Sequence, residues 1–168
     1  MKKNLMFFVF AFLIFGGVNN FSAATALSGF SSAAAGSAGK SSGFTLKDQN
    51  DASYTIKFPR DKVTVLILGD REGSEQIEGW TRPIYNQFGN RIDVYGIAEL
   101  SAVPSLARGI VRRIIKQRTK YSVLLDWSGG VSKAYGYEKG KANVVVIDKK
   151  GNVLAKRTGA ANRSGLQA

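Results

Sequence analysis

The chain has 168 residues, with 24 Lys and Arg, 12 Asp and Glu, no His and no Cys, which makes its formal net charge +12. Without Cys there is no disulfide, thiol nucleophile or thiolate metal ligand. Without His there is no imidazole base and no Ser-His-Asp triad. The composition therefore excludes thiol oxidoreductases, thiol peroxidases and His-dependent hydrolases.

The first 26 residues have the pattern of a secretory signal peptide. Lys2 and Lys3 precede an apolar run over residues 5–18, and Ala24 and Ala26 stand at the −3 and −1 positions of a cleavage site. The run is shorter than the roughly 20 residues that span a bilayer, so we expect export to the periplasm or beyond rather than an uncleaved membrane anchor. Cleavage would lower the net charge from +12 to +10 by removing two Lys.

Composition divides the rest of the chain into three parts. Residues 27–42 are rich in Ser, Ala and Gly and carry little apolar surface, which predicts a flexible linker. Residues 43–161 form the predicted folded domain, and residues 162–168 form a short C-terminal tail.

The first half of the domain predicts a hairpin followed by a strand–helix–strand unit. Strands near 44–46 and 54–58 flank a polar turn, and the apolar run over 63–68 is typical of a strand buried on both faces. A helix follows, with Ser74 as its predicted N-cap and apolar residues at 77, 80, 84 and 88. The next strand covers 92–97.

The second half predicts another helix, a strand, a short helix and a closing hairpin. The helix starts near Pro104 and carries an apolar stripe at residues 106, 110, 111, 114 and 115. A strand at 121–125, a short helix at 131–135 and strands at 144–147 and 152–156 follow. This order predicts an α/β sandwich in which helices flank a central mixed sheet.

Three segments resemble the thioredoxin-like superfamily, in its redoxin or thiol-specific-antioxidant style. These are the strand and helix over 61–88, the strand, Asp and aromatic-Gly turn over 121–136, and the final hairpin over 144–159. An exported sub-branch, the YtfJ-type proteins, is the nearest in pattern. The resemblance implies a thioredoxin-like sandwich with an N-terminal hairpin extension and a shortened C-terminal helix, which leaves one sheet face less covered.

The chain departs from this family where the family does its chemistry. The position of the family's nucleophilic Cys falls in the window Gly73, Ser74 and Glu75. The family's cis-Pro position falls on Ala142, where we expect a trans peptide because a cis bond without Pro costs about 3 kcal/mol. These four residues are the candidate lining of a ligand cleft without thiol chemistry.

Two charged segments offer alternative sites. Acidic residues crowd residues 70–78, which suits either a divalent cation or simply the positive end of a helix dipole. Arg108, Arg112, Arg113 and Lys116 lie on the predicted 104–120 helix, where they form either a solvated face or a surface for anionic partners.

Three functional hypotheses stay open. The first is a non-catalytic binding or accessory protein of the cell envelope, with a protein or peptide partner. The second is a basic surface protein that binds anionic lipid or polysaccharide through the 104–120 helix. The third is an enzyme that uses the carboxylates of residues 70–78, with a cation. The first two imply no catalytic residue, cofactor or metal, and no pattern indicates a nucleic-acid partner.

Overall fold

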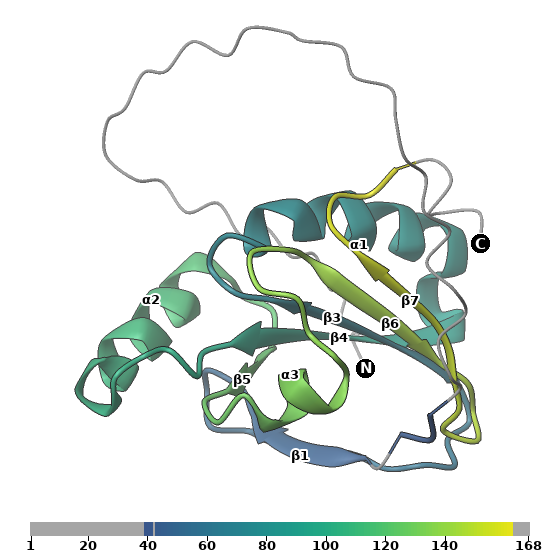
Figure 1. Cartoon of the computed structure of the whole chain (residues 1–168), viewed down its shortest axis with the longest axis horizontal. Helices are drawn as coiled ribbons and strands as arrows, with labels where there is room; N and C mark the ends of the chain where they lie inside the picture. The colour runs from purple at the N-terminus through teal and green to yellow at the C-terminus, as the bar shows by residue number, and fades with distance from the viewer. Residues whose placement is uncertain (1–38, 42, 163–168) are drawn as a thin grey trace, which may run out of the picture.

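The computed structural model describes residues 39–41 and 43–162. Figure 1 shows them as a central sheet with helices packed on its faces. The predicted signal peptide, most of the predicted linker and residues 163–168 lie outside the described residues.

The element order agrees with the order predicted from the sequence. The strands are β1 (Phe44–Lys47), β2 (Ser53–Ile56), β3 (Val63–Gly69), β4 (Ile92–Glu99), β5 (Val123–Asp126), β6 (Asn143–Ile147) and β7 (Val153–Thr158). The helices are α1 (Ser74–Phe88), α2 (Arg108–Arg118) and α3 (Gly130–Ala134), with short 3₁₀ turns η1 (Gly89–Arg91) and η2 (Ser105–Ala107).

The central sheet is mixed, with strand order β5-β4-β3-β6-β7. Strands β3, β4 and β5 are parallel and are joined by crossovers through α1 and α2, whereas β6 pairs antiparallel with both β3 and β7. Strands β1 and β2 form a separate hairpin. The predicted mixed sandwich with an N-terminal hairpin is confirmed.

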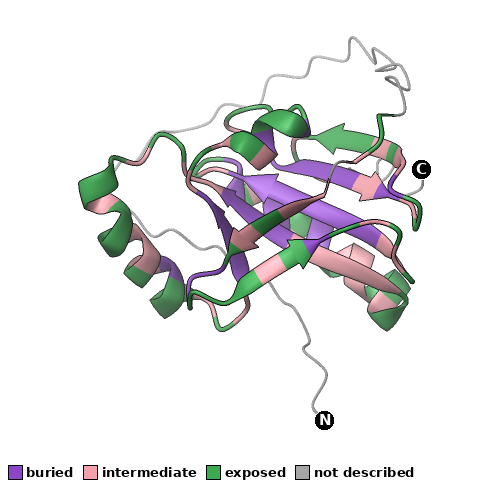
Figure 2. Ribbon diagram, turned by 90° about the horizontal axis from the view of Figure 1, so that it is seen from below, coloured by how far each residue is buried: buried purple, intermediate pink, exposed green. Residues whose placement is uncertain are grey.

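The core lies on both faces of β3, the strand predicted to be buried on both sides. Val65 and Ile67 belong to the cluster on the α1 and α2 face, whereas Leu66 and Leu68 belong to the cluster on the hairpin and α3 face. Side chains alternate across a strand, so a continuous apolar run can fill both layers at once. Figure 2 shows the resulting buried centre and exposed periphery.

Residues 39–41 lie beside the turn between β6 and β7. The backbone N–H of Ser41 donates to the carbonyl of Gly151 at 2.7 Å, and that of Val153 donates to Gly39 at 3.2 Å. The Ser41 hydroxyl also bonds to the phenol of Tyr135. The end of the predicted linker thus contacts the domain.

None of the helices in the described part of the chain is long and apolar enough to cross a bilayer.

Candidate functional site

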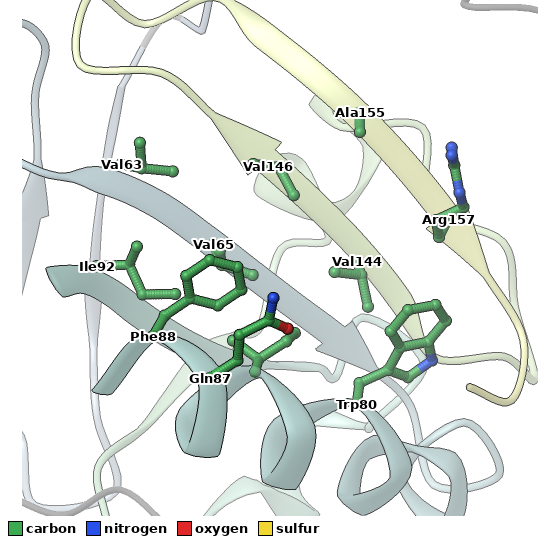
Figure 3. Close-up of a pocket in the computed structure, with 11 residues that line it drawn as sticks. Val63, Val65, Trp80, Gln87, Phe88, Ile92, Val144, Val146, Ala155 and Arg157 are labelled. Atoms are coloured by element: carbon green, nitrogen blue, oxygen red, sulfur yellow. The ribbon is translucent and has the colours of Figure 1, made fainter. Parts of the chain in front are cut away.

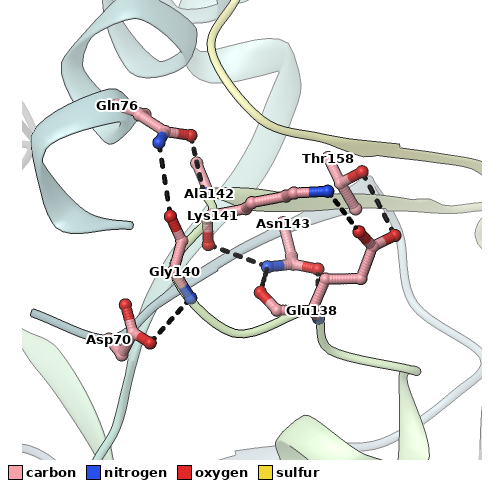
Figure 4. A network of polar contacts seen from close by, with 8 residues as sticks. All are labelled: Asp70, Gln76, Glu138, Gly140, Lys141, Ala142, Asn143 and Thr158. Atoms are coloured by element: carbon pink, nitrogen blue, oxygen red, sulfur yellow. Dashed lines mark hydrogen bonds and ion pairs between the residues drawn. The ribbon is translucent and has the colours of Figure 1, made fainter. Parts of the chain in front are cut away.

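The loop after β3 meets the loop that enters β6, and Asp70 joins them. Its Oδ1 accepts a hydrogen bond from the backbone N–H of Gly73, and its Oδ2 accepts one from Gly140, both at 2.8 Å. The two loops are 70 residues apart in sequence. One carboxylate therefore holds the start of α1 against the β6 loop, as Figure 4 shows for the contact with Gly140.

Gln76, on the first turn of α1, makes a second bridge to the same loop. Its Nε2 donates to the carbonyl of Gly140 at 3.4 Å, and its Oε1 accepts from the N–H of Ala142 at 3.1 Å. Backbone groups left unpaired by a loop need partners when they leave water. Here the chain itself supplies them, in place of an outside ligand.

Gly73 lies directly against the backbone of Lys141. A Cβ built on Gly73 would come 2.3 Å from the Lys141 carbonyl oxygen and 2.5 Å from its carbon. The backbone angles of Gly73 (φ −62°, ψ −26°) suit any residue, so the contact is the reason that glycine is needed. In this geometry no side chain fits at Gly73, a thiol included.

The other residues of the predicted cleft have distinct surroundings. Ser74 is buried and its hydroxyl donates to the carbonyl of Arg71 at 2.6 Å, whereas Glu75 is exposed. Ala142 is fully buried. Gly73 lies next to Ala142, since its added Cβ would be 3.1 Å from the Ala142 nitrogen, while a ligand-binding role for these residues stays a prediction.

Two local expectations are resolved by the structure. The prediction that Ser74 caps α1 is wrong, because Ser74 is the first residue of the helix and Gly73 is the N-cap. The Ser74 hydroxyl donates to the carbonyl of Arg71 instead of capping the helix. The expected trans peptide at Ala142 is confirmed, since the cis bond of the described chain is Phe58–Pro59.

Hydrogen bonds stabilise the negative charge of Asp70 where the loop after β3 meets the loop before β6. Burial by itself would raise the pKa of Asp70, but the bonds from Gly73, Gly140 and Tyr137 hold it below its usual value. Burial, followed by the neighbouring Asp70 charge, raises the pKa of Tyr137. Asp70 is thus ionised and Tyr137 neutral at neutral pH, which suits a structural clamp.

Asn143, at the start of β6, completes the arrangement. Its Oδ1 accepts from the N–H of Glu138 at 2.8 Å, and its Nδ2 donates to the carbonyls of Glu138 and Lys141 at 2.9 Å. Gln76, Tyr137 and Asn143 were not predicted as site residues. Their partners lie in other loops or are backbone atoms, so no local pattern could have indicated them.

The acidic residues at 70–78 do not converge on one point. Asp70 is committed to backbone N–H groups, Glu78 pairs with Arg82, and Glu75 is exposed. Within the described chain, no group of three or more His, Cys, Asp or Glu side chains is placed to hold a metal ion.

The four basic residues predicted on the 104–120 helix fall into two pairs. The Arg112 Nη1 is 2.6 Å from the carboxylate of Asp51, and the Arg108 guanidinium lies over the Trp127 ring at 5.5 Å. These two side chains tie α2 to the domain. Arg113 and Lys116 are exposed, and neither forms an ion pair with another residue of the described chain.

The predicted apolar stripe of this helix is only partly buried. Ile115 packs in the core, and Val111 and Ile114 are half-buried, but Leu106 is 96% exposed and Ile110 is 64% exposed. Residues three or four apart on a helix are neighbours, so Ile110, Arg113 and Lys116 share one side. We call Ile110, Arg113 and Lys116, together with Leu106 of the preceding turn η2, the α2 outer face; α2 lies at the left of Figure 2.

Comparison with solved structures shows the fold class. The chain is similar to the pneumococcal exposed lipoprotein thioredoxin of Streptococcus pneumoniae, with a TM-score of 0.60 and 17% identity over 74% of this chain and 95% of that one. It is also similar to StoA from Bacillus subtilis, with a TM-score of 0.55 and 12% identity over 74% and 93% of the two chains. It is similar as well to a thioredoxin-family thiol:disulfide interchange protein from Chlorobium tepidum, with a TM-score of 0.54 and 15% identity over 79% of this chain and 93% of that one.

No family model matches the chain, and no curated protein sequence matches it. At these identities the structural likeness shows the fold alone. The protein thus has a thioredoxin-like fold, as the sequence resemblance implied, and it contains no cysteine.

Proposed function

We propose that this protein is a non-catalytic, thioredoxin-like binding protein that docks on an anionic lipid surface of the cell envelope. The observation that carries the proposal is the α2 outer face, where exposed Leu106 and Ile110 stand beside Arg113 and Lys116. Apolar side chains that enter a headgroup layer, next to cations that pair with lipid phosphates, are the features of interfacial helices. The predicted signal peptide supports a place in the envelope.

The joined loops support the non-catalytic part of the proposal. Gly73, in the window of residues 73–75 where the resemblance places a nucleophile, faces the Lys141 carbonyl and has no room for a side chain. Asp70 and Gln76 use their polar atoms to satisfy backbone groups. This region therefore serves to hold the sheet and α1 together, and we place the binding surface elsewhere on the domain.

The contacts of Arg108 and Arg112 within the domain are consistent with docking through the other side of α2. The contacts of Arg108 with Trp127 and of Arg112 with Asp51 join one side of α2 to the domain, so its other side faces outward. A preorganised surface loses less side-chain and backbone freedom on binding than a flexible one.

The test is co-sedimentation of the protein with phosphatidylglycerol vesicles and, in parallel, with phosphatidylcholine vesicles. We expect binding to the anionic vesicles that weakens with added salt, because surface charge interactions are screened. Each Lys or Arg near an anionic surface contributes about 1 kcal/mol, so Arg113→Gln with Lys116→Gln should weaken binding at least tenfold.

The apolar component is tested with Leu106→Ser and Ile110→Ser, which should also reduce binding. Leu154→Ser is the matched control, since Leu154 is a 61% exposed leucine on β7 rather than on α2. Equal binding by the α2 variants and the wild type, or equal binding to both kinds of vesicle, would contradict the proposal.

A further inference from the structure

An apolar groove lies between α1 and the sheet, away from the α2 outer face. It has a volume of about 260 Å³, with Val65, Val144 and Val146 on its floor and Trp80 and Phe88 on the α1 wall. Figure 3 shows these side chains converging from α1 and from strands β3 and β6. Apolar lining with few polar groups is the usual character of a small-molecule site.

The groove follows α1 along the sheet face toward β7. The described chain after β7 contains no helix up to Asn162, and it crosses α1 at Gly79, whose added Cβ would lie 3.3 Å from that of Ala161. The groove therefore extends past this crossing toward the end of α1. Phe88, at that end, is 37% exposed.

The cationic side chain of Arg157 lies at the end of the groove opposite Phe88. Arg157 on β7 pairs in register with Val144, and among the described residues it is the only charged one that lines the groove. Its Nη1 donates to the carbonyl of Lys156, and it belongs to no ion pair in the described chain. The other guanidinium N–H groups remain as donors for a carboxylate.

We propose that this groove binds an anionic amphiphile, a linear hydrocarbon chain that ends in a carboxylate. The hydrocarbon chain lies between Phe88 and Trp80 and the carboxylate meets Arg157, which matches the single charge of the groove. The helical rise from Trp80 to Phe88 is about 12 Å, so a chain of medium length covers the floor. This site is independent of lipid docking by α2.

The test is calorimetric titration of the full chain with decanoate, octanoate and decanol. Each buried methylene tightens binding about fourfold, so decanoate should bind more than tenfold tighter than octanoate. Arg157→Gln should weaken decanoate binding about tenfold or more, because it removes a charge-assisted hydrogen bond, while decanol binding stays unchanged.

Substitutions inside and outside the groove test the place of binding. Ala155→Phe fills the floor from β7 and should abolish binding of both decanoate and decanol, whereas Leu154→Phe, on the other face of β7, should change neither. Gln87→Trp narrows the rim and serves as a second blocking variant if Ala155→Phe does not fold by circular dichroism. The paired substitution of Leu106 and Ile110 should leave decanoate binding intact, which separates this site from vesicle docking.

Three results would overturn the proposal. The first is no binding of decanoate to the full chain, and the second is an equal effect of Arg157→Gln on decanoate and decanol. The third is binding of decanoate only after residues 163–168 are deleted, which would show that this chain's own segment occupies the groove.

Discussion

The contact between Gly73 and Lys141 makes a sharp prediction about stability. Glycine to alanine at helical backbone angles normally stabilises a protein by about 0.4–1 kcal/mol, because it restricts the unfolded chain. At Gly73 the new methyl group would come 2.3 Å from a carbonyl oxygen, and a backbone atom cannot rotate away as a side chain can. Overpacking of this kind costs typically 1–3 kcal/mol. We therefore expect Gly73→Ala to lower the free energy of unfolding by about 1–2 kcal/mol, the overpacking cost less the usual gain.

The matched control is Gly109→Ala on α2. A Cβ at Gly109 meets nothing within 4 Å, so the same substitution should raise stability by about 0.5–1 kcal/mol, the ordinary helix preference. Urea unfolding followed by circular dichroism measures both changes, and an unchanged slope would show that the two unfolding reactions are comparable. If Gly73→Ala is as stable as the wild type, the close contact between Gly73 and the Lys141 carbonyl is not the reason for glycine at this position.

Three further substitutions test two contacts beside Gly73 and one contact of α2. Asp70→Asn should destabilise the protein by about 1–3 kcal/mol, since it removes a charged acceptor for two backbone N–H groups. The lowered pKa of Asp70 means that this contribution is fully present above the unfolded value near 3.9 and is lost as pH falls through the folded value. The stabilities of variant and wild type from urea titrations should therefore approach each other as pH falls below about 3.9. Gln76→Leu should destabilise by about 1–3 kcal/mol, because the N–H of Ala142 loses its partner, and it should speed hydrogen exchange at that amide. Arg112→Ala should cost only about 0.2–1 kcal/mol, because its pair with Asp51 is partly exposed; a larger loss in thermal unfolding would show that α2 depends on that pair.

Local patterns were sufficient for the element order and the class of fold. The apolar run of β3 predicted a strand buried on both faces, since alternate side chains point to opposite layers and both were apolar. Boundaries were less well determined: the predicted strand at 121–125 lies at Val123–Asp126, and the predicted helix start near Pro104 is a 3₁₀ turn before α2. Helix ends depend on contacts that propensity alone does not describe.

What the sequence by itself determined is the chemistry that this protein lacks and the layers that it builds. The absence of Cys and the hydropathy periods are local properties, so they can be read without knowing which residues meet. Tertiary structure alone decided that Gly73 faces Lys141, that Gln76 pairs with the β6 loop, and that Leu106 and Ile110 remain exposed. A helical stripe shows which side of a helix is apolar, but only the packed sheet decides how much of that side it can cover.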